Sequence, residues 1–393
     1  MLQPADEQEI REIVSQHAAS GSALEIVGGG TKQGIGRPRE TTRLSTSRLN
    51  RVINYDPAEL ILTVEPGAKL SEIEALLAQH NQMLAFDPWD FAETAGGEPN
   101  RSTIGGVIGS GFAGPRRISA GSVRDHMLGF HAINGRGEAF KAGGNVVKNV
   151  TGYDLPKLMA ASWGQLCVLT QVTLKVLPRP PESRTLALRG LSHAAAVDAM
   201  SRAMRAPADV AAACHIPAQT SEPSITAIRL EGFGPSIEAR ARLLTGLLAD
   251  AGKLEPMQTS EAGTHWLCIR AGNLPQSHQL PLLWRIIVPP AAGADALDGI
   301  ERFGGIGMLD WAGGLIWART VAEAAVSIRE VADLSGGHAM LVSAPEEVQR
   351  DIPAQHPEQP GVAALSHRVR AAFDPSGVFD PHRFDAHRAR APA

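Results

Sequence analysis

The sequence predicts an α+β protein of two domains followed by a short C-terminal segment, and two observations support this. Two glycine-rich segments, GGGTKQGIG at 28–36 and STIGGVIGSGFAGPRR at 102–117, lie where short helices and strands alternate. From residue 184 onward, alanine-rich helices and strands follow one order twice. The 393 residues can bury two or three hydrophobic cores, because a domain usually takes about 100–200 residues.

The first domain opens with a helix over 6–19 and a buried strand over 24–27, which follow from the spacing of their apolar side chains. The strand leads directly into 28–36, whose five glycines free the backbone to present several N–H groups to one anion. No Gly-Lys-Ser/Thr ends this segment, so it is not a Walker A loop.

Caps and turns predict the rest of the first domain, which we place at 1–180. Ser71 and Glu74 have the spacing of a capping box, and Asn134-Gly135 is typical of a hairpin turn. Prolines 178, 180 and 181 mark the boundary. The predicted elements are strand 60–64, helix 71–80, hairpin 130–141 and strand 166–178.

The repeat at 184–343 predicts a ferredoxin-like cap domain, in which two split βαβ units share one antiparallel sheet with helices on one face. The first unit is predicted as strand 185–189, helix 193–204, strands 209–215 and 225–230, helix 236–250 and strand 266–270. The second is strand 283–288, helix 293–302, strands 306–311 and 314–318, helix 320–333 and strand 339–343. A loop at 345–360 precedes a helix at 361–373, and we expect 361–384 to return to the first domain.

The amino-acid composition limits which kinds of partner and which cellular compartment we expect. A net charge of -4 and a pI near 6.4 give no broad basic field for nucleic acid. The cysteines Cys167, Cys214 and Cys268 form no C-x-x-C pair, so we expect no disulfide framework, no metal site and a reducing cytoplasm. The acidic start is unlike a signal peptide, and charges interrupt the alanine-rich run at 193–214. We expect a cytoplasmic protein that is peripheral to the inner membrane only through a partner.

Gly109, Gly111 and Gly114 have the G-x-G-x-x-G spacing of a nicotinamide-dinucleotide fingerprint. That fingerprint needs a preceding strand, a helix opening at the motif and an acidic side chain about 20 residues later. Asp125 comes too early, and Pro115 follows the last glycine. We therefore interpret the spacing as coincidence.

The two glycine-rich segments, about seventy residues apart, predict one shared ligand with a polyphosphate body. Thr31, Lys32 and Gln33 add a hydroxyl, a positive charge and an amide to the first. The second permits close approach of a flat group to the backbone. One such segment alone would more simply be a tight turn, whereas the pair favours ligand binding.

The order GGGTKQ, DPAELILTVEPGAKLSEIEALL, STIGGVIGSGFAGPRRISAGSVRDHMLGF and GNVVKNVTGYDLPKLMAASWGQLCVLTQVTLKVLP resembles FAD-binding domains of the vanillyl-alcohol oxidase and p-cresol methylhydroxylase (PCMH) type. More narrowly, it is similar to FAD-binding subunits of bacterial glycolate oxidase (glycolate dehydrogenase). The resemblance is strong over residues 1–180. Over the remaining residues it rests only on the architecture and on the FDPSGVF segment. It implies an FAD-dependent oxidoreductase of 2-hydroxy acids, in glyoxylate metabolism, with a two-subdomain PCMH-type FAD-binding domain.

The resemblance also implies the cofactor-binding residues. The first segment would bind the pyrophosphate, the second would lie along pyrophosphate and flavin, and the loop at 124–125 would support them. Val168, after Gly164, would meet the flavin through its backbone. The residues so implied are Gly28, Gly29, Gly30, Thr31, Lys32, Gln33, Thr103, Gly105, Gly106, Gly109, Ser110, Gly111, Arg124, Asp125, Gly164 and Val168.

Three departures qualify the resemblance. Thr31 and Lys32 follow Gly30 where covalent members carry a histidine, and the second segment has no cysteine, which predicts non-covalent FAD. Cys167 and Trp163 replace a usual glycine and glutamate near the flavin. Lys148 and Tyr153 are interpreted equally as flavin neighbours or as packing.

No catalytic residue is predicted. Related D-2-hydroxy-acid dehydrogenases carry H-x-x-G-D-G-N-x-H, which binds the substrate and takes its proton, and this chain lacks it. His215 and His265, beside cysteines in expected strands, and His338 are interpreted as packed side chains. Arg229, Arg270 and Arg285 are candidates for binding a carboxylate.

Three hypotheses follow. In the first, the chain is the FAD-binding subunit of a heteromeric 2-hydroxy-acid dehydrogenase, whose homologous FAD-containing partner oxidises the substrate while an iron–sulfur partner takes single electrons. In the second, it is an autonomous FAD oxidoreductase acting on another alcohol or hydroxy acid. In the third, it is a scaffold that binds FAD without turnover. The missing histidine motif favours the first and third, and the paired glycine segments favour the first over the third.

Overall fold

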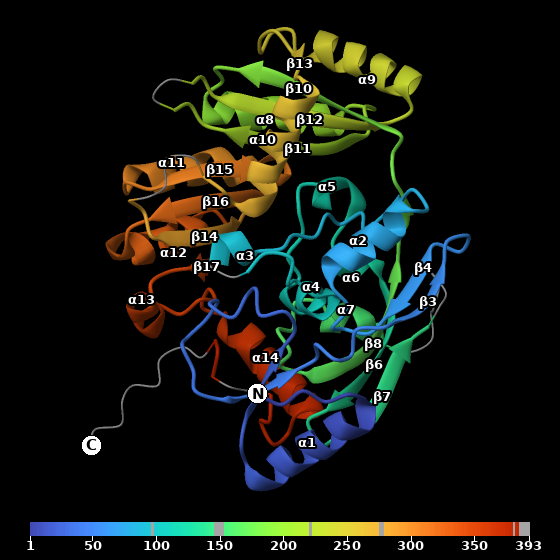
Figure 1. Cartoon of the computed structure of the whole chain (residues 1–393). Coiled ribbons are helices and arrows are strands. Elements are labelled where there is room, and N and C mark those ends of the chain that lie inside the picture. Colours follow the sequence, from blue (N-terminus) through green and yellow to red (C-terminus); the bar gives the residue numbers. More distant parts are fainter. Residues whose placement is uncertain (96–97, 145–152, 220–221, 275–278, 380–381, 385–393) are drawn as a thin grey trace. The chain divides into compact units, whose positions relative to one another are not determined.

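A computed structural model describes the chain except for residues 96–97, 145–152, 220–221, 275–278, 380–381 and 385–393 (Figure 1). The chain divides into two compact units. Unit 1 comprises 1–113, 121–179 and 357–393, and unit 2 comprises 114–120 and 180–356. The seven residues at 114–120, which follow the second glycine-rich segment, therefore pack with unit 2 rather than with their chain neighbours.

Unit 1 is built on a five-stranded sheet in the order β3-β4-β8-β6-β7, in which all neighbouring strands are antiparallel (Figure 1). Two further strand pairs accompany it, β1 with β2 and β5 with β9. The strands of unit 1 are β1 Leu24–Val27, β2 Thr42–Ser45, β3 Val52–Asp56, β4 Ile61–Val64, β5 Gln82–Met83, β6 Met127–Asn134, β7 Ala139–Gly143, β8 Cys167–Lys175 and β9 Leu177–Pro178. Its helices are α1 Glu7–Ser20, α2 Leu70–Ala78, α3 Ala92–Ala95, α4 Ile104–Ser110, α6 Val123–His126, α7 Leu155–Met159 and α14 Pro360–Phe373.

The central strands β6 and β8 are largely buried, and hydrophobic cores lie on both of their faces. The pairing of β8 with β6 is irregular between Leu169 and Gln171, so residues before and after Thr170 do not follow one simple alternation. On β8, Val172 and Leu174 join a core with Ile73 of α2 and Ile104 of α4. Val168 belongs instead to a second core with α1, β1, β2 and the C-terminal residues Val378 and Phe379. The chain end is thus part of the hydrophobic packing of unit 1.

The second glycine-rich segment contains a helix, α4, that is not among the elements predicted from the sequence. Thr103 is extended and its Oγ1 accepts a hydrogen bond from the Gly106 N–H, so it caps α4 at its N-terminus. The helix ends at Gly111, which is left-handed at φ 64°. The helix ends, rather than begins, at the glycines with the G-x-G-x-x-G spacing, which agrees with the interpretation of that spacing as coincidence.

Unit 2 contains an eight-stranded sheet in the order β13-β10-β12-β11-β15-β16-β14-β17, whose two halves join where His215 of β11 pairs with Leu309 of β15. Each half runs strand, helix, two strands, helix, strand, as the sequence repeat predicts. The first half is β10 Glu182–Arg189, α8 His193–Arg205, β11 Val210–Ile216, β12 Ile225–Gly232, α9 Gly234–Leu247 and β13 Glu255–Pro256. The second is β14 Leu282–Ile287, α11 Gly293–Arg302, β15 Ile306–Asp310, β16 Leu315–Thr320, α12 Ala325–Leu334 and β17 His338–Ser343, with 3-10 turns at Pro290–Ala292, Trp311–Gly313 and Ala322–Ala324.

Helices α8, α9, α11 and α12 share one hydrophobic core with the sheet of unit 2, to which alternate side chains such as Ile228, Trp284 and Ile316 contribute. Residues 114–120, which include α5 (Arg117–Ala120), are held by polar contacts. The Trp311 Nε1–H donates to the Gly114 carbonyl at 3.0 Å, and Arg116 forms a bidentate ion pair with Glu231.

Several predicted elements are wrong. Residues 266–270 lie in helix α10 (Thr259–Ala271), so His265 is helical, and the fourth strand of that half is β13. The predicted loop at 345–360 contains α13 (Glu346–Asp351). The N-cap of α2 is Lys69 without a side-chain hydrogen bond, so the Ser71–Glu74 capping box does not form.

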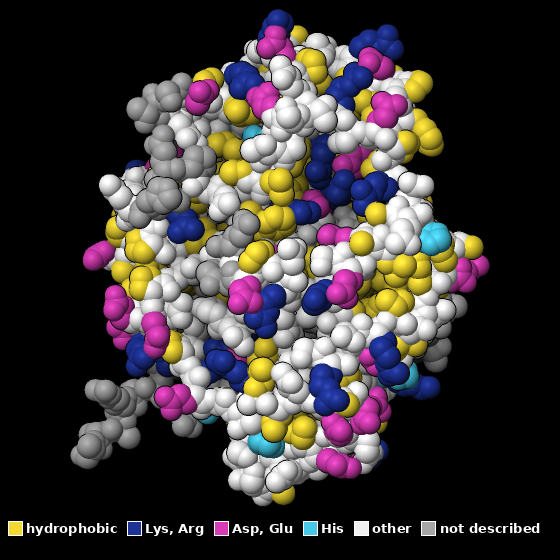
Figure 2. All heavy atoms as spheres, in the orientation of Figure 1, with side chains coloured by type: hydrophobic (Ala, Val, Ile, Leu, Met, Phe, Trp, Pro, Cys, Tyr) yellow, Lys and Arg dark blue, Asp and Glu magenta, His cyan; other side chains and the backbone are white. Residues whose placement is uncertain are grey.

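Neither charge sign dominates the surface that Figure 2 shows, where acidic and basic side chains are interspersed, in keeping with the small net charge. No helix within the described parts of the chain is both long and apolar enough to cross a bilayer.

The returning C-terminal segment is fixed by one carboxylate. Asp374 follows α14, and its two oxygens accept hydrogen bonds from the N–H groups of Val378 at 2.9 Å and Phe379 at 2.6 Å. The same side chain lies so close to Gly135 of the β6–β7 hairpin that a Cβ there would approach Oδ1 to 2.1 Å. The FDPSGVF turn therefore packs against the β6–β7 hairpin at Gly135, where a larger residue would not fit.

We expect Asp374→Ala to destabilise this turn by about 1–3 kcal/mol, because two buried N–H groups lose a charged acceptor. Hydrogen–deuterium exchange should show faster exchange at the Val378 and Phe379 amides. Glu59→Ala, at an exposed position of unit 1, is the matched control. Unchanged exchange in Asp374→Ala would contradict this role.

Candidate functional site

The two glycine-rich segments lie against each other in unit 1. A Cβ on Gly29 would lie 1.4 Å from the Arg101 carbonyl oxygen, and one on Gly28 would lie 2.2 Å from Thr103 Oγ1. No side chain fits at either position, so glycine is required for the contact itself. The end of β1 and the start of α4 are thereby brought together.

Two cavities use the first segment as a shared wall. One measures about 100 Å³ and extends towards Trp163 and Leu169, and the other measures about 760 Å³ and extends towards Arg43 and Lys69. Both are lined by Val27, Gly28, Gly29, Gly30, Thr31, Gln33 and Thr103. An elongated ligand whose middle lies on Gly28–Gly30 would therefore find space for a group at each end.

Two glycines of α4 keep backbone accessible to the smaller cavity. A Cβ on Gly109 would meet nothing within 4 Å, and one on Gly106 would meet only Thr103 Oγ1, at 3.5 Å. Gly105 differs, because its Cβ would lie 2.8 Å from the Pro66 carbonyl oxygen. Gly105 thus serves packing, whereas Gly106 and Gly109 leave room for a ligand.

The smaller cavity is lined by two buried cations, which favour the binding of an anion. Lys32 is 8% exposed and Arg383 is 7% exposed, and both line it. Burial lowers the Lys32 pKa to about 8, against attraction from Asp90 and with added repulsion from Arg383. Burial, with Arg39 nearby, lowers the Arg383 pKa well below its ordinary value. Two buried cations that repel each other favour a bound anion between or beside them.

Arg383 also fixes the shape of the first segment. Its Nε donates to the Ile35 carbonyl at 2.9 Å and a terminal nitrogen donates to the Lys32 carbonyl at 2.5 Å. Its guanidinium lies 4.7 Å from the centre of the Trp163 ring. Glu25, on the same cavity wall, is paired with Arg39 and Arg43, so its charge is neutralised.

Most of the residues predicted to bind the cofactor are brought together at this cavity. They are Gly28, Gly29, Gly30, Thr31, Lys32, Gln33, Thr103, Gly105, Gly106, Gly109, Ser110 and Gly164.

Four predicted residues do not line either cavity. Gly111 packs against Ala161 as the C-cap of α4, and Asp125 accepts from the backbone and hydroxyl of Ser122 in a capping box. Arg124 is exposed beside it. The side chain of Val168 points into the opposite core, while its neighbours Cys167 and Leu169 face the cavity. Only a backbone contact of Val168, as the sequence suggested, stays a prediction.

Sequence reasoning missed Arg383 and underrated Trp163. Arg383 lies about 350 positions after Lys32, and no local pattern indicates that they meet. Trp163 and Gly164 both have positive φ, 55° and 74°, and Trp163 packs edge-on against Phe112 and Phe384. Tyr153 is exposed, and Lys148 lies outside the described residues.

The histidines considered as bases are held in unit 2 and stay neutral near pH 7. Burial lowers the His215 pKa to about 3 and the His265 pKa to about 4. His215 Nδ1 is bonded to Thr226, and His265 Nε2 lies 3.2 Å from Cys214 Sγ. The His338 pKa is also lowered, by partial burial and by Arg285.

The candidate arginines are distributed over unit 2. Arg229 pairs with Glu231 and covers Trp266, and Arg270 lies in α10. Arg285 and Arg117 both lie over Trp311, at 5.1 and 4.4 Å from its ring centre. Burial and then Arg117 lower the Arg285 pKa to about 9.

Comparisons with known proteins agree with this geometry. The family described as FAD binding domain matches residues 1–143. The chain is 34% identical over 387 residues to glycolate oxidase subunit GlcE of Escherichia coli (strain K12), covering 98% of this chain and 99% of that protein. It is 30% identical over 141 residues to glycolate oxidase subunit GlcD of Bacillus subtilis, which is 35% of this chain and 28% of that one. The solved structure of p-cresol methylhydroxylase with substrate bound shares the fold, with a TM-score of 0.69 and 13% identity over 97% of this chain and 87% of that chain.

The predicted α+β fold of PCMH type and the prediction of an FAD-dependent oxidoreductase are thereby confirmed.

We expect Gly109→Val to reduce FAD affinity by roughly tenfold or more, equivalent to about 1.4 kcal/mol, because the new side chain would occupy ligand space. The apoprotein should keep its thermal midpoint, since no described atom outside the adjoining residues and the backbone of its own helix lies within 4 Å of the new Cβ. Flavin absorbance per chain and differential scanning calorimetry measure the two effects. Gly361→Val, in α14 and likewise without neighbours, is the control. Full flavin retention in Gly109→Val would refute this placement.

Proposed function

Because this chain belongs to the family of the glycolate oxidase subunit GlcE, we propose that it is the FAD-binding subunit of a heteromeric glycolate (2-hydroxy acid) dehydrogenase. Residues 1–180 would form the FAD-binding domain, 184–343 the ferredoxin-like cap and 361–384 the segment that returns to the first domain. The proposal rests on one observation: the two glycine-rich segments line two cavities, and two buried cations lie beside these segments.

The residues present fit FAD. The pyrophosphate would lie on the backbone of Gly28–Gly30, with Lys32 and Arg383 supplying positive charge and Thr31 a hydroxyl. Gly106 and Gly109 would let the cofactor approach α4 closely. When bound, FAD supplies a hydride acceptor, and the protein's part is to hold it and exclude water.

The attachment would be non-covalent. Cys167 is the only cysteine among the described cavity residues, and no histidine is among them. Burial raises the pKa of the Cys167 thiol to about 12, and its Sγ lies 3.3 Å from Met159 Sδ. A protonated thiol is a poor nucleophile.

The oxidation of substrate would occur mainly on a homologous FAD-containing partner. A general base must lie within hydrogen-bond reach of the substrate hydroxyl. The carboxylates among the described cavity residues are Glu25, which is paired with two arginines, and Glu98, which pairs with Arg101. The candidate histidines are held by packing in unit 2. This chain would then bind FAD as an electron carrier or a structural element.

An iron–sulfur subunit would take the electrons one at a time. Three cysteines are too few to hold a cluster in this chain, so that partner must be a separate protein.

Any attachment at the inner membrane would be peripheral and would come through this complex, with the chain itself in the cytoplasm.

Lys32 makes FAD affinity depend on pH. Its pKa is about 8 in the empty site, below the ordinary 10.5, and a bound pyrophosphate would raise it. Binding then requires the protonated form, so affinity should be constant below about pH 8 and fall as pH rises above it, by up to about tenfold per unit.

Lys32→Met should bind FAD more weakly at neutral pH and lose this pH dependence. Isothermal titration of the apoprotein with FAD at several pH values measures both effects. Lys141→Met, at an exposed position on β7, is the control. A wild-type affinity that rises with pH above 8 would contradict the assignment.

The proposed division of labour is tested by purifying the chain alone and together with its partners. We expect the isolated chain to contain FAD that glycolate and D-lactate do not bleach anaerobically, and the complex to be bleached by the physiological hydroxy acid. Bleaching of the isolated chain would favour an autonomous enzyme. A colourless chain that FAD does not reconstitute would refute FAD binding, and FAD that is never reduced within an active complex would assign this chain as a scaffold.

A further inference from the structure

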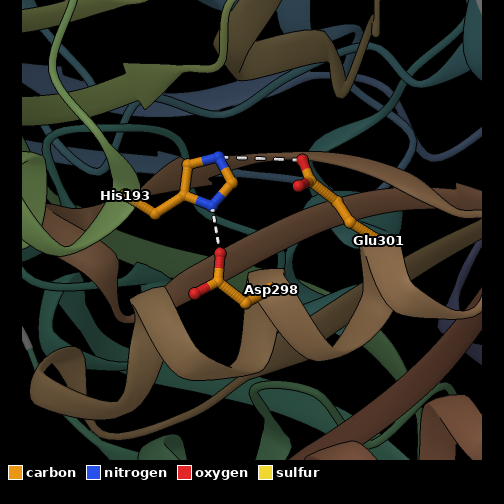
Figure 3. Close-up of side chains that lie close together, drawn as sticks. All are labelled: His193, Asp298 and Glu301. Carbon is orange, nitrogen blue, oxygen red and sulfur yellow. Dashed lines mark hydrogen bonds and ion pairs between the residues drawn. The ribbon is translucent and has the colours of Figure 1, made fainter.

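A histidine and two carboxylates meet where the two halves of unit 2 pack, in a place that the flavin does not require (Figure 3). His193 is the first residue of α8, in the first half. Asp298 and Glu301 lie three positions apart on α11, in the second half, and so share one face of that helix. Their candidate ligand atoms all lie within 4.8 Å of one another.

The hydrogen bond to Asp298 prepares His193 as a ligand. His193 Nδ1 lies 2.6 Å from Asp298 Oδ1, so Nδ1 carries the hydrogen and donates it to the carboxylate. Nε2 then keeps its lone pair, and it faces Glu301 Oε1 at 3.7 Å, beyond hydrogen-bond distance. A histidine that donates one ring N–H to a carboxylate and presents the other nitrogen is the usual arrangement at protein metal sites.

We propose that His193 Nε2 and Glu301 bind a divalent transition-metal ion such as Zn²⁺, with Asp298 orienting the imidazole. Ligand distances near 2.0–2.2 Å place two ligands of one zinc ion roughly 3–3.5 Å apart, so a small closing movement of Glu301 suffices. Imidazole together with carboxylate favours zinc, nickel or copper over magnesium and calcium.

The surroundings suit a cation that enters from solvent. The His193 side chain is 14% exposed, while Asp298 and Glu301 are 54% and 40% exposed. Behind His193 lies the buried ring of His215, 5.6 Å away, whose Nε2 has no hydrogen-bond partner among the described residues. A bound ion would link α8 to α11 and thus one half of the sheet to the other.

Zinc titration of the full chain after treatment with EDTA tests the site. We expect one ion per chain at pH 7.5, together with a higher thermal midpoint, because a ligand that binds only the folded state stabilises it. His193→Gln and Glu301→Gln should remove or strongly weaken this binding. Asp298→Asn should weaken it by about 10–100-fold, as loss of an orienting carboxylate does at other metal sites.

His356→Gln is the matched control. His356 also pairs with a carboxylate, its Nε2 lying 2.9 Å from Asp333 Oδ1, but its Nδ1 accepts a hydrogen bond from the Ala339 N–H. Both of its nitrogens are therefore engaged, and His356→Gln should bind zinc as the unaltered chain does.

Circular dichroism of each variant checks that it is folded. Zinc binding that His193→Gln retains in full would assign the ion to another place and overturn the proposal. A folded chain that binds no zinc at millimolar concentration would also overturn it. Equal loss of binding in His356→Gln would overturn it as well.

Discussion

The contact between two backbone segments, Gly28–Gly30 and Arg101–Thr103, is the constraint on which the ligand cavities depend. The second segment is anchored because the Leu70 N–H donates to the Ser102 carbonyl and the Ile104 N–H to the Ala68 carbonyl. The first cannot accept a side chain at Gly29, because a Cβ there would overlap the Arg101 carbonyl. The end of β1 is therefore held beside the N-terminus of α4, and the two segments together line the cavities.

Charge adds a second condition. Lys32 and Arg383 are both buried, and Arg383 donates to the Lys32 carbonyl. Burial lowers both pKa values, and Asp90 opposes the shift of Lys32. The empty unit carries the unfavourable desolvation of these cations, and an anionic ligand would remove it. Part of the binding free energy of an anionic ligand would therefore come from compensating the two cations, whose burial already costs free energy in the folded unit. The position of Arg383 is set by Trp163 and Phe384, so aromatic packing fixes where the positive charge lies.

Local signals predicted much of this structure, and the errors have physical causes. The strand 24–27 and the helix 293–302 have the predicted bounds, because each carries an unbroken apolar pattern with clear breakers at its ends. Helix α4 was missed since glycine has low helix propensity, which Thr103 capping and burial of Ile104 and Ile108 overcome. Residues 266–270 were assigned to a strand because a short apolar run does not distinguish the two structures. The glycines of the site were predictable from their spacing, whereas Arg383 depends on a contact across nearly the whole chain.

The path of the chain between the units affects how the protein is made. It crosses between them at 113/114, 120/121, 179/180 and 356/357, and unit 1 receives Asp374, Phe379 and Arg383 only after unit 2 has been synthesised. A ribosome that has completed residue 179 has produced both glycine segments but not the turn and the guanidinium that hold the first of them. Assembly of this cavity wall therefore has to wait for residues 374–383, and a chain that lacked them would lack the contacts that hold the first glycine segment.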